Sequence, residues 1–283
     1  MQDRSCGGRV LLTELTAHVA EWMVENGRAP ASRSCAGHTL DRFVRFAAAF
    51  GIHDAADVTP EIARAFIEAP GVNGSVPSVP TMHDRRAAVR LAFRLQYRAD
   101  PHIFDPTYDL ALPSRTTHPA RPLTDDEVEI LRSVSVSTLI ETRQPVIIAL
   151  AEAGAVTTEI ATVAAKHIHE GTVWLSGGRA VPRTVTLTSW GAQQVTRRAV
   201  AVPDGALVCG EHTECGQASV SVALRRMFDL AQLSSENDVR LGSLRAWAGR
   251  RAFDESGRIE DAARVLGCRS LDAAARTIGW SWR

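Results

Sequence analysis

The chain has little of several residue types, and each shortage narrows its possible functions. It contains two tyrosines among 283 residues and a single lysine, Lys166, so almost every positive charge is an arginine. No apolar run approaches the roughly 18 residues that span a bilayer, and the first residues lack a charged-then-apolar signal pattern. We therefore expect a cytoplasmic protein with no membrane partner.

Cysteine and net charge are also low. The five cysteines form an odd, scattered set, unlike a disulfide framework, so we expect them to be reduced. The 32 basic side chains are balanced by 32 acidic ones, which argues against a uniformly basic nucleic-acid binder. What is present is an ordinary globular composition, 45% apolar and 23% charged, in a chain long enough for two domains.

Residues 1–100 are expected to form a helical domain. Apolar residues recur at helical spacing in four segments, Leu11–Asn26, Thr39–Phe50, Pro60–Ala69 and about Thr81–Tyr97. Five prolines follow between residues 101 and 122 without a clear period, and proline fixes φ and removes a backbone donor. We expect an extended linker over residues 101–122.

Residues 123–283 are expected to form a second domain that is mainly helical. Thr124 to Glu127 has the pattern of a capping box and opens a helix to about Val134. Helical spacing continues at 143–153 and 157–165, and again from about residues 189, 219, 243, 258 and 271. Two short β-rich runs, Thr172–Leu175 and Val181–Leu187, flank a glycine-containing turn and predict a hairpin. The fold class is therefore mainly α with a small β-hairpin or sheet.

A cationic stripe marks the fourth helical segment, where arginine recurs at every fourth position: Arg86, Arg90, Arg94 and Arg98. At 100° per residue these side chains cover roughly 120° of the helix, and no acid within the segment relieves their repulsion. A DNA phosphate backbone would do so, because arginine makes bidentate phosphate contacts. The alternative is a solvated face paired with acids from elsewhere in the fold. Arg42 and Arg45 could form a companion patch.

Three short motifs, taken in order with the elements above, resemble a tyrosine recombinase of the phage-integrase family. Residues 154–160 (GAVTTEI) are similar to the family's G-x-R-x-x-E-[LI] pattern. Residues 242–245 (GSLR) resemble H-x-L-R, and residues 266–270 (LGCRS) resemble L-G-H-x-S. The resemblance covers nearly the whole chain. It implies an N-terminal SAM-like core-binding domain and a C-terminal domain with the integrase catalytic fold.

The resemblance also implies a chemistry whose residues are mostly missing. Enzymes of this family attack the scissile phosphate with a tyrosine, while two arginines, a lysine and histidines assist. The matching positions hold Val156 for the first arginine, Gly177 or Gly178 for the lysine, Gly242 and Cys268 for histidines, and Thr277 for the nucleophile. Only Arg245, the second arginine, is kept. Because the only tyrosines are Tyr97 and Tyr108, we expect no intact catalytic set and a degenerate family member.

The sequence thus favours a pseudoenzyme that clamps duplex DNA at a specific site, with no cofactor and no small-molecule substrate. Further candidate DNA contacts are Arg183, Arg225, Arg226 and Arg245. Two alternatives are open: an active recombinase with a non-standard nucleophile, and a protein-interaction module that no longer binds DNA. If DNA binding holds, a nucleoid-associated role in mobile-element or plasmid maintenance, or in regulation, would follow.

Two further signals are weaker. Cys209, His212 and Cys215 have metal-loop spacing, but a fourth ligand is missing from the neighbourhood, so we expect no metal. Trp280 and Trp282 lie near the end of the sequence given. They could form a homo-oligomer contact or pack back onto their own domain.

Overall fold

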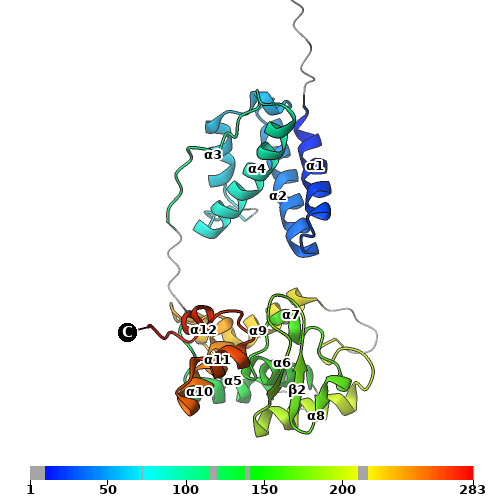
Figure 1. Ribbon diagram of the computed structural model, residues 1–283, viewed down its shortest axis with the longest axis vertical. Coiled ribbons are helices and arrows are strands. Elements are labelled where there is room, and N and C mark those ends of the chain that lie inside the picture. Colours follow the sequence, from blue (N-terminus) through cyan, green and yellow to red (C-terminus); the bar gives the residue numbers. More distant parts are fainter. Residues whose placement is uncertain (1–9, 72, 115–119, 138–140, 210–215, 283) are drawn as a thin grey trace, which may run out of the picture. The chain divides into compact units, whose positions relative to one another are not determined.

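The computed structural model describes residues 10–71, 73–114, 120–137, 141–209 and 216–282. The chain divides into two compact units, Met1–Thr116 and Thr117–Arg283, each with its own core (Figure 1). The division falls inside the segment expected to be a linker. Among the described residues, no helix is long and apolar enough to cross a membrane.

The first unit contains four α-helices, α1 (Leu12–Glu25), α2 (Pro30–Ala48), α3 (Pro60–Glu68) and α4 (Val79–Ala99). Prolines occupy the first turns of α2, α3 and α4, where their missing N–H is not needed. Helix α2 begins nine residues before the expected start, because the polar stretch from Pro30 lacks a strong apolar period. The core is built around Phe43, whose ring meets Phe66 and Phe93 edge-on at 5.1 and 6.4 Å.

The segment after α4 belongs largely to the first unit. Ile103 and Leu110 are each 4% exposed and lie in its hydrophobic core. Proline content alone led to the expectation of an extended linker, but apolar side chains between the prolines tie residues 101–112 onto the helices.

The second unit is organised around α6 (Arg143–Glu152), in which every residue from Pro145 to Glu152 is buried. The other helices are α5 (Asp125–Ser135), α7 (Thr157–Ile160), α8 (Ser189–Ala201), α9 (Gln217–Leu230), α10 (Gly242–Ser256), α11 (Ile259–Leu266) and α12 (Leu271–Thr277). Helices α5, α8, α9 and α10 all contact α6, and α11 packs on α10. The predicted capping box is confirmed: Glu127 N–H donates to Thr124 Oγ1 at 3.3 Å and Thr124 N–H donates to Glu127 Oε2 at 2.8 Å.

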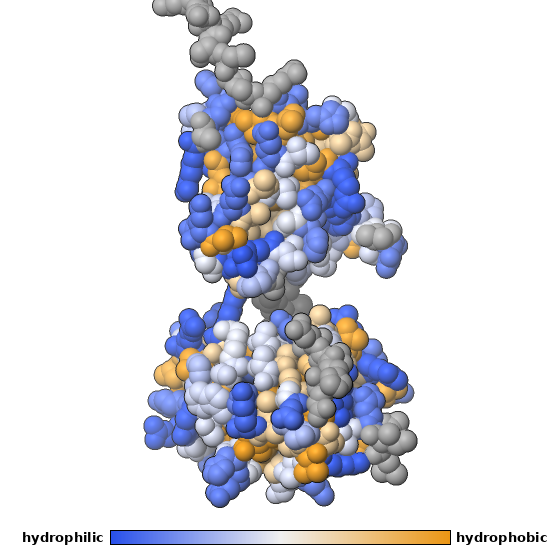
Figure 2. All heavy atoms as spheres, turned by 90° about the vertical axis from the view of Figure 1, so that its right-hand side faces the viewer, coloured by the Kyte–Doolittle hydropathy of each residue, from blue (hydrophilic) through white to orange (hydrophobic). Residues whose placement is uncertain are grey.

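A three-stranded antiparallel sheet completes the second unit, in the order β1 (Ile168–His169), β2 (Thr172–Leu175) and β3 (Arg183–Thr186). The hairpin of β2 and β3 confirms the prediction. Strand β1 was missed because two residues are too short for any alternation to be visible. The mainly α fold class with a small β-sheet is confirmed. Figure 2 shows polar residues over the visible face of each unit, with apolar residues in small separate patches.

Candidate functional site

The turn between α6 and α7 gathers the motif residues of the second unit. Gly154 has a φ of +92°, and its carbonyl accepts from Arg245 Nε at 3.0 Å and Arg183 Nη2 at 2.8 Å. A Cβ at this position would lie 2.9 Å from the Val265 carbonyl oxygen, at the end of α11. Glycine is therefore required both for its backbone angle and for the close approach of two chain segments.

Arg245, which the resemblance matched to the second arginine of the recombinases, is directed at the protein's own backbone. It comes from the first turns of α10, and its Nη2 donates to the Leu266 carbonyl while Nε donates to Gly154. Burial lowers the pKa of the Arg245 guanidinium, and the adjacent Cys268 partly opposes this shift. Because the last carbonyls of a helix have no partner within the helix, Arg245 caps the end of α11.

Arg183 is buried beside it, with 6% of its side chain exposed. Its guanidinium binds both carboxylate oxygens of Glu159, at 2.7 and 3.2 Å, and its Nε donates to the Val265 carbonyl at 2.6 Å. Gly267, at φ +61°, leaves room for this side chain, since a Cβ there would overlap Arg183 Nη1. The expectation that Arg183 contacts DNA is wrong for this conformation, because its donors are consumed by internal acceptors.

The positions that the resemblance matched to catalytic residues lie at helix starts and in a turn of the second unit. Val156 precedes α7, and its N–H donates to Glu159 Oε2 at 2.9 Å. Gly177 and Gly178 lie between β2 and β3 at positive φ. Gly242 opens α10 with nothing within 4 Å of where a Cβ would be.

Hydroxyl groups near the expected nucleophile are also engaged. Thr277 Oγ1 donates to the Ala273 carbonyl at 2.7 Å, and Ser270 Oγ accepts from the Ala273 N–H at 3.2 Å at the start of α12. The structure brings Arg245 and Cys268 together, but no hydrogen bond among the described residues joins Thr277 to Arg245. Both tyrosines lie in the first unit.

Of the three metal-loop candidates, only Cys209 lies among the described residues. Cys209 is disulfide-bonded, so the expectation that all cysteines are reduced is wrong at this position. An odd total does not exclude a single pair, and a disulfide sulfur is no thiolate ligand. His212 and Cys215 lie outside the described residues. No group of three or more His, Cys, Asp or Glu suited to an ion occurs among the residues described.

The arginine stripe on α4 is split into two halves. Arg90 binds Asp105 at 3.1 Å and the Thr107 carbonyl at 2.7 Å, so an acid does relieve this position. At this position the structure has the alternative interpretation, an arginine paired with an acid from elsewhere in the fold, because Asp105 lies beyond the helix in the segment taken for a linker. Arg86 is partly buried, its Nε has no hydrogen-bond partner, and burial lowers the pKa of its guanidinium. Arg94 and Arg98 are exposed, with no ion pair to another described residue.

The other candidate arginines also divide into those that are hydrogen-bonded within the protein and those that are exposed to solvent. Arg42 donates to the Pro70 carbonyl, whereas Arg45 is exposed and, among the described residues, hydrogen-bonds to the Asp41 carbonyl of its own helix. Arg225 and Arg226 are exposed on α9 without a described partner. Sequence reasoning missed Arg85, which is 5% exposed and caps α3 through the carbonyls of Phe66, Ile67 and Ala69 at 3.2, 2.9 and 2.6 Å. No sequence signal reveals this capping role, because the groups that accept the hydrogen bonds are main-chain carbonyls, which every residue has.

The two C-terminal tryptophans pack within the second unit. The Trp280 ring lies 5.5 Å from Phe253, the Trp282 ring lies 4.5 Å from Trp280, and Trp282 Nε1 donates to Asp272 at 3.1 Å. Of the two expected outcomes, the described structure has packing onto the same domain. A homo-oligomer contact through this segment stays a prediction.

Comparison with known proteins places this arrangement in a fold family. No family model and no curated sequence matches the chain. Among solved structures, a lambda integrase dimer bound to a COC' core site aligns with a TM-score of 0.73 at 15% identity, covering 98% of this chain and 80% of that one. Lambda integrase residues 75–356 bound to DNA give 0.72 at 16% identity, covering 96% and 98%. The Tn1549 transposon integrase with circular intermediate DNA gives 0.65 at 13%, covering 95% of each chain. The chain therefore has the fold of the tyrosine recombinases and integrases.

Proposed function

We propose that this chain is a duplex-DNA-binding protein of integrase fold that does not cut strands. The proposal that strands are not cut rests on one observation. The second unit, residues 117–283, contains no tyrosine. Losing one charge-stabilising donor slows an enzyme by about a hundred- to a thousandfold, whereas losing the nucleophile removes the covalent route.

The remaining hydroxyl groups do not offer a replacement. A serine or threonine must be activated by an adjacent base before it attacks phosphate. Thr277 donates its hydroxyl hydrogen to the Ala273 carbonyl, and the matched neighbours Gly242 and Cys268 are not histidines. Arg245, the group that would hold the phosphate, is bonded to two backbone carbonyls instead.

DNA binding is supported by free guanidinium groups and by the complexes in which the fold occurs. Arg94 and Arg98 on α4 and Arg225 and Arg226 on α9 are exposed and have no described ion pair. Structures with the same fold include lambda integrase bound to a core site and the Tn1549 integrase with DNA. Phosphate contacts by arginine need neither a nucleophile nor a proton donor, so binding persists where cutting is lost. The proposal also includes homo-oligomerisation and a role in mobile-element, plasmid or regulatory processes. DNA binding does not depend on either of them.

The test begins with selection of bound duplexes from a random-sequence pool, using the full chain. Selected duplexes are then prepared with a nick at successive positions. If the protein cuts near the nick, the short fragment between cut and nick diffuses away. Religation is then impossible, and any covalent protein–DNA intermediate accumulates. We expect retardation that weakens steeply with added salt and no adduct that survives denaturant. An adduct lost in Thr277→Ala or Ser270→Ala would overturn the inactive half of the proposal. Absence of any salt-dependent retardation would overturn the DNA-binding half and favour a protein-interaction module.

A further inference from the structure

We infer that a surface at the end of helix α4 binds single-stranded DNA, with unpaired bases stacked on its aromatic side chains. This surface, called the aromatic platform below, consists of Arg94, Tyr97 and Arg98 on α4 with Phe104 and Tyr108 from the segment that follows the helix. The inference rests on the proposed DNA binding and extends it to a second form of DNA, because a single strand exposes base faces that a duplex keeps stacked inside.

Three aromatic side chains between residues 97 and 108 are exposed to solvent. Phe104 is 76% exposed, Tyr108 is 75% exposed and Tyr97 is 49% exposed. Tyr97 and Tyr108 are the only tyrosines of the whole chain. Single exposed apolar residues are common on protein surfaces, but rings gathered in one place offer π faces on which other rings can stack.

The chain after α4 turns back along the face that carries the arginines. Asp105 Oδ2 accepts from Arg90 Nε at 3.1 Å, although Arg90 lies nine residues before the end of the helix. At 100° per residue, Arg94 and Tyr97 lie within roughly 40° of Arg90 on the helix surface. The returning segment therefore passes beside these two side chains before it reaches Arg90, and this brings Phe104 to the same face.

The segment that carries Phe104 and Tyr108 has an ordered backbone. Side chains that are 0–4% exposed anchor it between the two rings and on either side of them: Ile103, Thr107 and Leu110. The Asp105 carboxylate also accepts from the N–H and the hydroxyl of Thr107, at 2.8 and 2.7 Å. A prearranged backbone lowers the entropy that is lost when a ligand binds, so the rings are prepared for stacking.

Two guanidinium groups beside these rings are available for phosphate. Arg94 and Arg98 are exposed and form no ion pair with another described residue, whereas Arg90 is already paired with Asp105. Proteins that bind single strands combine a cationic surface along the backbone with aromatic side chains on which the bases stack. The aromatic platform has both elements, and a free anion or a duplex would use only the guanidinium groups.

The charges near Tyr108 limit where the phosphates can lie. Glu61, Asp109 and an Arg64 that is already paired with Glu68 line a pocket of about 200 Å³ beside Tyr108. Phosphates are repelled by the two acids and attracted by the free arginines of α4. The backbone of the strand is therefore expected along α4, with bases directed towards the rings.

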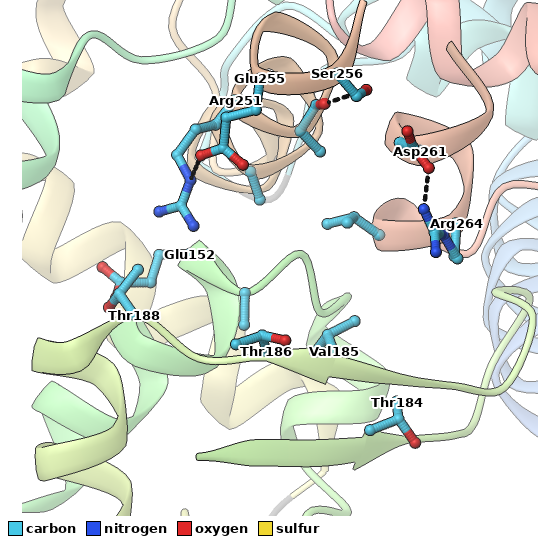
Figure 3. Close-up of a pocket in the computed structure, with 14 residues that line it drawn as sticks. Glu152, Thr184, Val185, Thr186, Thr188, Arg251, Glu255, Ser256, Asp261 and Arg264 are labelled. Atoms are coloured by element: carbon cyan, nitrogen blue, oxygen red, sulfur yellow. Dashed lines mark hydrogen bonds and ion pairs between the residues drawn. The ribbon is translucent and has the colours of Figure 1, made fainter. Parts of the chain in front are cut away.

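The groove of the second unit shown in Figure 3 lacks this combination. It has a volume of about 390 Å³, and Arg251 of α10 and Arg264 of α11 are among the residues that line it. Both arginines already have an acid partner, Arg251 with Glu255 at 3.1 Å and Arg264 with Asp261. These paired guanidinium groups provide a matched control for the two free ones on α4.

The first experiment compares DNA probes on the full chain by fluorescence anisotropy. The probes are a labelled oligothymidylate strand of about 12 nucleotides, an abasic strand of the same length, and a duplex of mixed sequence. The abasic strand keeps every phosphate and lacks the bases, so only base contacts separate the two single strands. We expect the thymidylate strand to bind at least about fivefold more tightly than the abasic strand. Equal affinities would overturn the inference.

The second experiment removes the rings. Phe104→Ala with Tyr108→Ala should weaken binding of the thymidylate strand by about fivefold or more and leave the affinity for the abasic strand and the duplex unchanged. Phe104→Tyr with Tyr108→Phe keeps both rings and should bind as the unaltered chain does. Phe50→Ala, which removes a ring that is 59% exposed elsewhere in the first unit, is the matched control. No loss in the double alanine variant, or an equal loss in the control, contradicts stacking on the platform.

The third experiment tests the charges and separates this inference from the proposed function. Arg94→Ala with Arg98→Ala should weaken binding of both single strands, whereas Arg251→Ala with Arg264→Ala should not. Equal effects of these two double variants would remove the guanidinium groups of α4 from the inference and overturn it. Salt-dependent binding of the duplex without binding of the thymidylate strand would overturn the inference and leave the proposed duplex binding intact. Ring-dependent binding of the thymidylate strand without binding of any duplex would support the inference and overturn the duplex proposal.

Discussion

Arg183 joins three segments of the second unit that are far apart in the sequence. It binds Glu159 at the start of α7, the Gly154 carbonyl before it, and the Val265 carbonyl 82 residues along the chain. A buried ion pair of this kind is costly to break, because the partner is left charged and desolvated. Arg183 is thus a structural residue, even though its sequence position suggested a DNA contact.

Replacing either partner tests that role. Arg183→Met leaves the Glu159 carboxylate buried without its cation, and we expect the free energy of unfolding to fall by about 3–5 kcal/mol. Arg250→Ala, which removes an exposed i,i+4 pair with Asp254, should cost about 0–1 kcal/mol. Urea unfolding followed by circular dichroism measures both. Similar small losses in the two variants would contradict the structural assignment, and Arg183→Met with Glu159→Leu should recover much of the loss.

The sequence could predict which residue types are missing from the site but not what the remaining ones do. The absence of tyrosine from the second unit is countable, and the motif positions of Val156, Cys268 and Arg245 could be read directly. The acceptors of Arg245 and Arg183 are main-chain carbonyls, which have no sequence signature. Their capping roles therefore appear only when α6, β3 and α11 are brought together in space.

At the scale of the element, α4 combines two functions along one face. The first half of its arginine stripe holds residues 101–110 through Arg90, and the second half of the stripe presents Arg94 and Arg98 to solvent. The four-residue spacing is identical throughout, so the sequence alone could not divide the stripe. The division comes from Asp105 and from the Thr107 carbonyl, which face the first half only.

This division gives a matched test of DNA binding. The double variant Arg94→Ala with Arg98→Ala should lower affinity for all duplex sequences and reduce the slope of log affinity against log salt by about two units. Arg90→Ala should instead lower the stability of the first unit and leave the salt slope unchanged. Fluorescence anisotropy over a range of salt concentrations distinguishes these outcomes. An unchanged slope in the double variant would remove α4 from the proposed interface.

The capping box of α5 is a pH-sensitive element. Arg121 binds both Glu127 oxygens, at 2.7 and 2.8 Å, and this contact holds the pKa of the Glu127 carboxyl below its usual value of 4.5. A carboxyl with a depressed pKa contributes stability above its unfolded-state value, and the contribution is lost as pH falls through its folded-state value.

We therefore expect the free energy of unfolding of the second unit to decline as the solution is acidified below about pH 4.5. Glu127→Gln should make this decline shallower, because the substituted side chain cannot be protonated in that range. Urea unfolding at a series of acidic pH values provides the measurement. Parallel curves for the two proteins would show that Glu127 contributes nothing to the acid response.

At the scale of the whole molecule, two cores account for two units. One core is centred on the phenylalanines of α2, α3 and α4, and the other surrounds α6. Helical periodicity and the capping box were enough to predict most helices, and alternation was enough for the hairpin. The extent of α2, the two-residue β1 and the packing of residues 101–112 were not predictable, because tertiary contacts decide them.

A core substitution should act on the unit that contains it. Phe43 is fully buried between Phe66 and Phe93, and Phe43→Ala removes these contacts and leaves a cavity. We expect the first unit to lose about 3–5 kcal/mol of stability. Hydrogen exchange measured by mass spectrometry should show faster exchange in α1 to α4, with α6 and the sheet unaffected. Faster exchange throughout both units would contradict two separate cores.

The Arg245 contacts bear on how the surviving motif residue of this chain is interpreted. A guanidinium that closes a helix end is expensive to replace whether or not the molecule still performs chemistry, so thermodynamics alone can preserve it. The presence of Arg245 in this chain is therefore explained by the contacts that hold the end of α11 against Gly154. Catalytic competence has to be judged from groups that have no structural role besides their chemical one, such as the hydroxyl group of an attacking tyrosine.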